Sequence, residues 1–173
     1  MGTRNTRLRR VCAAACTAPL LLLGGVAFAG AAHAAPYTAT VTRAVQQSSP
    51  GEILALVNAE RAKANCEPLK EDPRLMQAAQ AHADDMAANN LTAHDGSDGS
   101  TALSRMQRAG YDPMGPSAEN VSGPGYDSSK AHVDGWMASD RGHRATILNC
   151  QYKETGIGTN GQFAVELFAV QSR

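Results

Sequence analysis

Residues 155–171, TGIGTNGQFAVELFAVQ, contain two runs of β-forming residues on either side of the pair Asn160–Gly161. An Asn-Gly pair favours the tight turn of a two-residue hairpin, because both residues tolerate a positive φ. In the second run the side chains alternate, so that Glu166 is expected on the strand face opposite to its two apolar neighbours. The segment therefore predicts an antiparallel hairpin near the C-terminal end of the chain.

Upstream of this hairpin, the sequence favours several helices and one extended segment. Two helices are expected to begin at a capping residue that is followed by proline, the first near Ser49 and the second after Asp72. The remaining expected elements are a short helix from Ser100 or Thr101 to Gly110, a strand over 116–125, a helix over 127–139 and one to two helical turns over 142–149. Helices that precede a small antiparallel sheet predict an α+β fold.

The chain is expected to divide into a signal peptide (1–34), an N-terminal tail or linker (35–50) and one domain (51–173). The first ten residues contain four arginines and no acid, an apolar stretch follows, and the sequence AHA precedes Ala35. This order is typical of a secretory signal peptide. Arg9–Arg10 would fit a twin-arginine signal, but the residues around the pair favour ordinary Sec export. We therefore expect a protein that is secreted and has no membrane span after signal removal.

The net charge argues against one class of function, and the cysteines predict a disulfide. The signal peptide holds four of the sixteen basic residues and none of the sixteen acidic ones, so the mature chain carries a net charge of about −4. Nucleic-acid binding requires a basic surface and is not expected. Two cysteines remain, Cys66 and Cys150, and in an exported protein such a pair is usually a disulfide, with a free thiol as the alternative. A loop of this length is worth about 4 to 5 kcal/mol in the chain-entropy model.

Polar residues able to do chemistry occur in three separated places, at His94, at Glu119–Asn120 and at His143. None of them forms a local metal-binding, nucleophile or phosphate-binding motif. Taken singly, each also has a structural explanation as a solvated loop residue, a turn cap or a link between helix and loop. The spacing of these residues alone does not identify a site.

Five stretches together carry a resemblance to a known family. They are SDRGHRATILNCQYKETGIG (139–158), LVNAERAKANCEPLKEDPRL (56–75), AQAHADDMAANNLTAHDG (79–96), GYDPMGPSAENV (110–121) and the segment around Trp136. In this order they resemble the CAP superfamily of cysteine-rich secretory, antigen 5 and pathogenesis-related proteins, and most closely its short bacterial secreted branch. The resemblance runs from about residue 53 to 170 and implies an α-β-α sandwich with a small antiparallel sheet between helices.

The resemblance also implies a cavity that holds two histidines and acidic residues. It assigns the histidines to His94 and His143 and one acid to Glu119, which is also the candidate general base of any catalytic site. Two imidazoles and a carboxylate suit zinc or another divalent metal with an open position for water. Many family members carry a second glutamate three residues after the tryptophan of the fourth helix, and here Ser139 occupies that position. This departure predicts weaker metal binding and a less complete catalytic site.

Two functions from different classes follow. The first is a non-catalytic, monomeric extracellular binding module whose His/Glu cavity can hold a divalent metal and whose partner is a lipid, a sterol or a cell-wall component. The alternative is a metal-assisted hydrolase that acts on peptides or cell-wall material through a metal-bound water. A wall-associated protein that binds no ion is a third interpretation. Because proteins of one fold carry many functions, the resemblance alone does not choose between them.

Several other polar or aromatic residues have mainly structural interpretations. His82 lies on the apolar stripe of its helix and is expected in the core. His132 is expected to be solvated. Glu166 is expected on a solvated face, with a second cavity carboxylate as the alternative. The remaining assignments are Asn58 and Arg61 as links between helix and loop, and Trp136 and Tyr152 as core aromatics.

Overall fold

The computed structural model describes residues 47–170. The predicted signal peptide and most of the predicted tail lie outside these residues and stay predictions. The C-terminal hairpin is confirmed. Strand β3 (Glu154–Asn160) pairs antiparallel with β4 (Phe163–Ala169), from Glu154 opposite Ala169 to Asn160 opposite Phe163. The turn is shifted by one residue from the predicted Asn-Gly pair: Asn160 ends β3 opposite Phe163, and Gly161, with a φ of +60°, is the first turn residue.

The sheet has four strands in the order β1-β3-β4-β2. Strand β2 (Ser117–Ser122), which the sequence predicted, pairs antiparallel with β4. Strand β1 (Lys70–Glu71) pairs parallel with β3 at the edge of the sheet and was not predicted. A strand of two residues is too short to show any alternation of side chains, and the pairing depends on a partner more than eighty residues away.

Five helices complete the described part of the chain, and all lie where the sequence favoured them. Asp72 Oδ1 accepts from the Arg74 amide at 2.8 Å and Thr101 Oγ1 from the Ser104 amide at 3.2 Å, so these two predicted caps are confirmed. Ser49 precedes α1 as predicted, but its side chain makes no capping hydrogen bond. The helices are α1 (Pro50–Lys63), α2 (Pro73–Asn89), α3 (Ala102–Arg108), α4 (Ser129–Ala138) and α5 (His143–Ile147).

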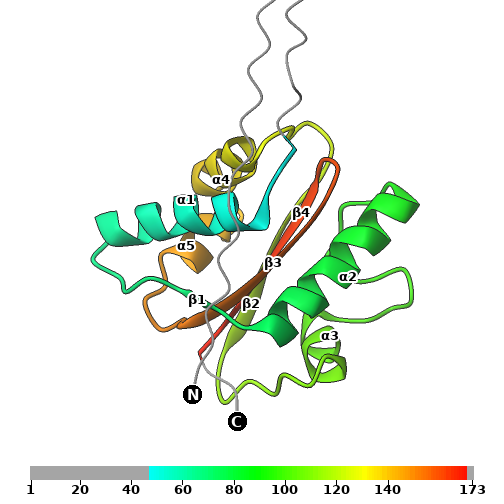
Figure 1. Cartoon of the computed structure of the whole chain (residues 1–173), viewed down its shortest axis with the longest axis horizontal. Helices are drawn as coiled ribbons and strands as arrows, with labels where there is room; N and C mark the ends of the chain where they lie inside the picture. The colour runs from blue at the N-terminus through cyan, green and yellow to red at the C-terminus, as the bar shows by residue number, and fades with distance from the viewer. Residues whose placement is uncertain (1–46, 171–173) are drawn as a thin grey trace, which may run out of the picture. The chain divides into compact units, whose positions relative to one another are not determined.

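The helices cover both faces of the sheet (Figure 1). Helices α2 and α3 lie on one face, and α1, α4 and α5 lie on the other. Strand β4 is therefore buried on both sides, with Val165 and Leu167 in the core under α2 and Phe168 in the core under α1. The fold is the predicted α+β sandwich. Glu166 does face away from Val165 and Leu167, but the second helical layer buries it completely, so its predicted solvation is wrong.

Helix α2 packs directly on the backbone of β3. A Cβ atom added at Gly156 would lie 2.1 Å from the Leu75 carbonyl carbon, and one at Gly158 would lie 2.3 Å from the Gln80 amide nitrogen. The two glycines lie two residues apart and hence on the same strand face. Their missing side chains let α2 approach closely enough for its apolar stripe to reach the sheet.

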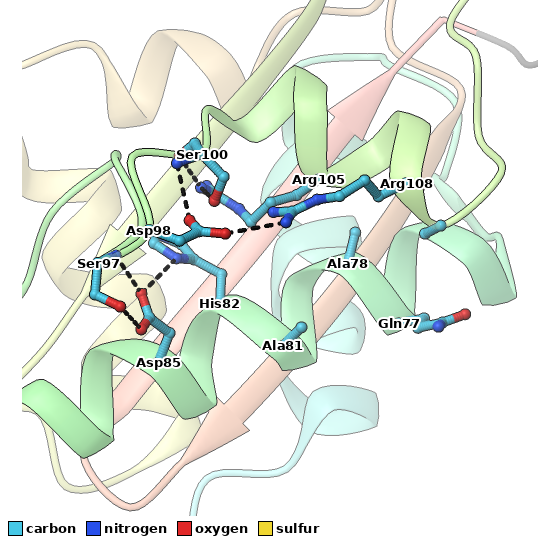
Figure 2. A pocket seen from close by; sticks show the side chains of 11 residues that line it. Gln77, Ala78, Ala81, His82, Asp85, Ser97, Asp98, Ser100, Arg105 and Arg108 are labelled. Carbon is cyan, nitrogen blue, oxygen red and sulfur yellow. Dashed lines mark hydrogen bonds and ion pairs between the residues drawn. The ribbon is translucent and has the colours of Figure 1, made fainter.

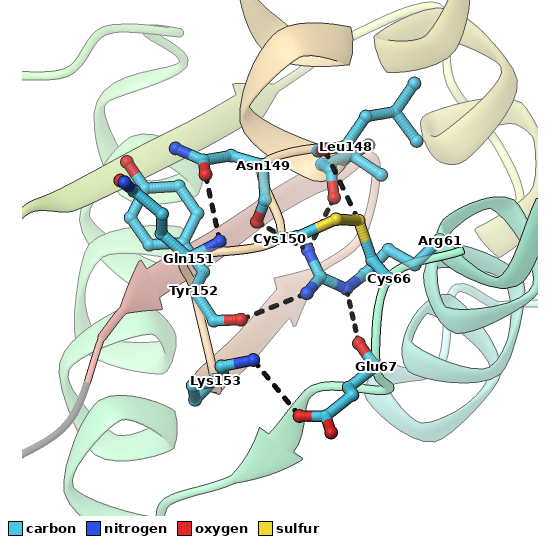
Figure 3. Close-up of a disulfide and its surroundings, with 10 residues drawn as sticks. Arg61, Cys66, Glu67, Leu148, Asn149, Cys150, Gln151, Tyr152 and Lys153 are labelled. Atoms are coloured by element: carbon cyan, nitrogen blue, oxygen red, sulfur yellow. Dashed lines mark hydrogen bonds and ion pairs between the residues drawn. A yellow bond between two sulfur atoms is a disulfide. The ribbon is translucent and has the colours of Figure 1, made fainter. Parts of the chain in front are cut away.

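The disulfide Cys66–Cys150 is confirmed and joins the end of α1 to the segment after α5, with Cα atoms 4.9 Å apart (Figure 3). Arg61 lies beside it and is fully buried. Its guanidinium donates to the carbonyl oxygens of Ile147, Asn149, Tyr152 and Glu67, at 2.7 to 3.1 Å. Arg61 thus fixes the segment that follows α5, as predicted, and burial lowers its pKa.

Candidate functional site

His94 lies in the loop between α2 and α3, and its ring is held from behind by Glu119 on β2. The ring Nδ1 is 2.9 Å from Glu119 Oε1. The second oxygen, Oε2, accepts from Arg105 Nη2 at 2.7 Å, and the same nitrogen donates to the His94 carbonyl at 2.9 Å. The Glu119 and Arg105 side chains are 3% and 5% exposed, whereas the His94 side chain is 59% exposed. A buried ion pair therefore orients an exposed imidazole.

His143 is the first residue of α5 and follows Gly142, which has a φ of +99°. This left-handed residue turns the chain sharply after α4, a conformation that glycine adopts without strain. The ring Nδ1 lies 3.1 Å from Ser139 Oγ, and the His143 carbonyl accepts from Asn120 Nδ2 at 3.2 Å. Ser139, at the position where many family members have glutamate, thus contacts the imidazole directly.

Strand β2 holds both histidine segments through two consecutive residues. Adjacent side chains of a strand point to opposite faces. Glu119 reaches the His94 ring on the α3 side of the sheet, and Asn120 reaches the His143 backbone on the α5 side. The sequence signal for this arrangement was the pair Glu119–Asn120 itself, but the role of the asparagine was not predicted.

The two imidazoles have pKa values that shift in opposite directions. The hydrogen bond to Glu119 raises the pKa of His94, and the negative charge of the same carboxylate adds to the effect. Burial lowers the pKa of His143, with smaller contributions from His94 and Arg141. The site therefore combines a ring that favours the protonated form with one that favours the neutral form. Nδ1 of each ring is engaged, so Nε2 is the nitrogen left for a ligand.

Both histidines line a cleft of about 840 Å³. Its walls come from the loop before α3, the end of β2, α4 and the turn between α4 and α5, and are polar and apolar in equal measure. Glu119 lies behind His94 and is not among the lining residues. Those residues are Thr92, Ala93, His94, Val121, Ser122, Gly123, Pro124, Tyr126, Gly135, Trp136, Ala138, Ser139, Asp140, Arg141 and His143.

A second polar pair borders the cleft. Ser122 Oγ lies 2.6 Å from His132 Nδ1, and the His132 ring lies between Tyr126 and Trp136, with ring centroids 5.6 and 6.2 Å away. His132 is fully buried, so its predicted solvation is wrong. Burial lowers the pKa of His132 to about 4. The ring is therefore neutral near pH 7 and shares one hydrogen bond with the Ser122 hydroxyl through Nδ1.

The donor atoms at the cleft fit a metal ion only in part. Within residues 47–170, no group of three histidine, cysteine, aspartate or glutamate side chains is arranged to hold a metal. His94 and His143 offer one nitrogen each, while both oxygens of Glu119 are already engaged by His94 and Arg105. A typical catalytic zinc site has three protein ligands. The assignment of Glu119 as a direct ligand stays a prediction, and its observed contacts are those of a residue that orients His94.

Comparisons with known proteins bear on the family and the fold of the chain. The family model described as the cysteine-rich secretory protein family, CAP, matches residues 54–171. The chain belongs to the CAP family. Its match to an extracellular protein with an SCP domain from Bacillus anthracis has a TM-score of 0.65 and 29% identity, and covers 69% of this chain and 39% of the other. An outer surface protein of Borrelia burgdorferi shares the fold, with a TM-score of 0.60, 21% identity and coverage of 69% and 90%.

Two curated relatives of this CAP chain come from Bacillus subtilis strain 168. The uncharacterized protein YkwD is 33% identical over 135 residues, and the uncharacterized membrane protein YlbC is 29% identical over 124 residues. The matches cover 73% and 72% of the CAP chain but only 51% and 35% of these relatives. Among the residues that the structure describes, no helix is long and apolar enough to cross a membrane.

Proposed function

We propose that this CAP chain is a secreted, non-catalytic binding module whose cleft takes up a polar component of the cell wall. The observation that carries the proposal is the lining of the cleft. Two imidazoles, four hydroxyl side chains (Thr92, Ser122, Tyr126 and Ser139) and the oppositely charged residues Asp140 and Arg141 line a volume of about 840 Å³. Lipids and sterols are mostly apolar and would leave the two imidazole Nε2 atoms and the charges of Asp140 and Arg141 without ligand partners, which is costly. A ligand rich in hydroxyl and amide groups can satisfy them.

An aromatic ring provides the apolar contact that such a ligand also needs. Tyr126 lines the cleft and packs against Gly135, where an added Cβ atom would lie 2.3 Å from the tyrosine ring. This contact restricts the ring to one side of the cleft. A fixed aromatic beside polar groups is a common arrangement for binding sites that orient a ligand. The structural neighbours named extracellular or outer surface proteins support secretion as the setting.

The contacts of Glu119 favour binding over hydrolysis. A general base must reach the proton that it removes, either directly or through one water. Glu119 is buried behind His94, and both of its oxygens accept hydrogen bonds or an ion pair from other side chains. Ser139 supplies a hydroxyl where many family members have a second carboxylate. Glu119, the candidate base, thus orients the His94 ring, and Ser139 contacts the His143 ring.

Binding to insoluble cell-wall material tests the proposal. We expect the mature protein to sediment with purified peptidoglycan and to stay in the supernatant with phosphatidylcholine vesicles that contain sterol. Arg141→Ala should weaken the association, because it removes a charged group from the cleft, and Arg108→Ala, on the opposite helical layer, serves as the control. Sedimentation with the sterol vesicles instead of peptidoglycan, or equal loss in both variants, would overturn the proposal.

Zinc or another divalent metal remains a proposal for the same cleft. Two imidazole nitrogens would hold the ion, and Glu119 would orient His94, as carboxylates commonly do for metal-bound histidines. We expect isothermal titration near neutral pH to give weak, saturable zinc binding that is lost when His94→Ala and His143→Ala are combined. Binding that survives the double substitution would place the metal elsewhere.

A further inference from the structure

A second cavity lies on the other helical layer, between α2 and α3 (Figure 2). It has a volume of about 340 Å³ and is separate from the cleft that holds His94 and His143. Its floor is formed by the small side chains of Ala78 and Ala81 on α2, and Ala109, directly after α3, also lines it. Its polar end is formed by residues of α2 and of the loop that precedes α3. No part of the proposed function uses this cavity.

His82 presents a nitrogen without a partner to this cavity. The residue is 1% exposed and its Nε2 lies 2.9 Å from the Ala93 carbonyl oxygen, which can only accept, so Nε2 carries the ring hydrogen. In the neutral ring Nδ1 then carries a lone pair and can only accept, and within residues 47–170 it has no hydrogen-bond partner. Asp85 Oδ2 is 4.0 Å away, too far for a hydrogen bond. A buried polar atom of this kind is rare and calls for an occupant.

The charges around the polar end favour a cation. Hydrogen bonds from the Ser97 amide and hydroxyl lower the pKa of Asp85, so its carboxylate is ionised at neutral pH. Among the described lysines and arginines, none forms an ion pair with Asp85, whereas Asp98 is paired with Arg108 at 3.0 Å and Arg105 with Glu119. The polar end therefore carries one negative charge that is not balanced.

We infer that this cavity binds the primary ammonium group of a small ligand, with the ammonium between His82 Nδ1 and Asp85 Oδ2 and its alkyl stem over the three alanines. Two acceptors 4.0 Å apart are bridged by one donor at normal hydrogen-bond distances, and an ammonium group has three N–H bonds to offer. The ion pair with Asp85 then balances the local charge. The volume restricts the ligand to a small amine or to the end of a lysine side chain.

Titration by two-dimensional NMR tests this site directly. n-Butylamine stands for a free amine, Nα-acetyl-lysine amide stands for a lysine side chain, and n-butanol is the uncharged control. We expect both amines to shift the amide signals of residues 81–85 and 97–100 in a saturable way, while n-butanol does not. The tighter of the two amines identifies the source of the ammonium group.

Substitutions on α2 provide matched variants for the same titration. Asp85→Asn keeps the shape of the side chain but removes its charge, and should weaken amine binding by about tenfold or more, the usual effect of a charge-assisted hydrogen bond. Asp84→Asn makes the same charge change one residue away, outside the cavity, and should change binding by less than about twofold. Ala81→Leu should block binding by filling the space above the alanine floor.

Three results would overturn the inference. Equal binding of n-butanol would assign the cavity to a neutral ligand, and no shift with any probe would mean that it holds only water. Equal effects of the Asp84 and Asp85 substitutions would reduce the binding to general surface charge. The chemical shifts are read at α2 and at the loop that precedes α3. These outcomes are therefore distinct from a failure of peptidoglycan to bind at the cleft.

Discussion

Glu166 is a buried acid at the centre of the sheet, and its ionisation should control stability at alkaline pH. Oε1 accepts from Thr155 Oγ1 at 3.3 Å, while Oε2 has no partner within residues 47–170. Burial raises the pKa of Glu166 to about 8, although Thr155 and Arg61 favour the charged form. The residue directly opposite in the β2–β4 register is Asn120, whose Oδ1 also lacks a partner in that range. We expect the protonated acid to donate to this oxygen.

The direction of the pH effect follows from proton linkage. Between the ordinary pKa of a glutamate and about 8, the folded protein holds a proton that the unfolded chain has released. The free energy of unfolding should therefore fall as the pH rises through this window and level off above it. Glu166→Gln carries a permanent N–H at this position, so the variant should lose this slope and exceed the wild type in stability at pH 9. Urea unfolding at pH 6, 7, 8 and 9 measures both effects.

The same urea unfolding measurements can contradict a protonated Glu166. If wild type and Glu166→Gln have parallel stability profiles, Glu166 does not change its protonation on folding. A less stable Gln variant at every pH would mean that the carboxylate form is the native one. Thr155→Val, which removes the hydrogen-bond donor to Oε1 and leaves the acid, is the control and should retain the slope.

Single residues were predictable from the sequence where their own element decided the environment. His82 and Trp136 lie on apolar stripes of their helices and are buried as expected. His132 and Glu166 have polar neighbours or alternate with apolar ones, which predicted solvent for both. Each is instead covered by a partner from another element, the Tyr126 and Ser122 side chains for His132 and the α1 layer for Glu166. The local pattern of apolar residues does not show whether another element covers the polar face of a helix or strand.

At the scale of elements, the close contact between α2 and β3 can be tested by substitution. Gly158→Ala should destabilise the protein by about 2 kcal/mol or more, because the new Cβ would overlap the α2 backbone, which cannot move aside as a flexible side chain can. Gly51→Ala, at a helical position with nothing within 4 Å of the added Cβ, should be neutral or slightly stabilising. Thermal unfolding of both variants measures the difference. A Gly158→Ala variant as stable as wild type would mean that α2 does not lie this close.

Most elements were predicted because their boundaries have local chemical causes. The Asp72 and Thr101 caps, the prolines at the starts of α1 and α2 and the Asn-Gly turn each identify an end of an element. Strand β1 escaped prediction because its two residues pair only through a distant partner. The close approach of α2 to β3 was also not predicted. Gly156 and Gly158 have low strand propensity, and their packing role becomes clear only once the helix above them is known.

At the scale of the whole molecule, the disulfide and Arg61 join α1 to the segment that leads into β3. The bridge spans 84 residues of sequence, and Cys150 is exposed to reductant. Replacing both cysteines by alanine should lower the free energy of unfolding by about 2 to 5 kcal/mol. Urea unfolding of wild type with and without dithiothreitol, beside the Cys66→Ala, Cys150→Ala double variant, measures this loss. Equal midpoints in all three samples would show that the bridge adds nothing.

The candidate site depends on long-range assembly and was only partly predictable. The resemblance to the CAP family identified His94, His143 and Glu119, and the fold brings their segments together from a loop, the start of α5 and a strand. The sequence could not reveal that Arg105 from α3 would take one oxygen of Glu119, or that Ser139 would bond the His143 ring. In these contacts the glutamate orients its neighbour, and its role as a ligand or base stays a prediction.

The central claim is that the cleft between the His94 loop and the turn before α5 is the ligand-binding site. The most direct measurement is NMR chemical-shift mapping of the mature protein with soluble fragments of enzymatically digested peptidoglycan. We expect saturable chemical-shift changes concentrated at residues 92–94, 122–126 and 139–143, with the ring signals of His94 and His143 among them. No shifts, or shifts confined to surfaces away from these residues, would contradict it.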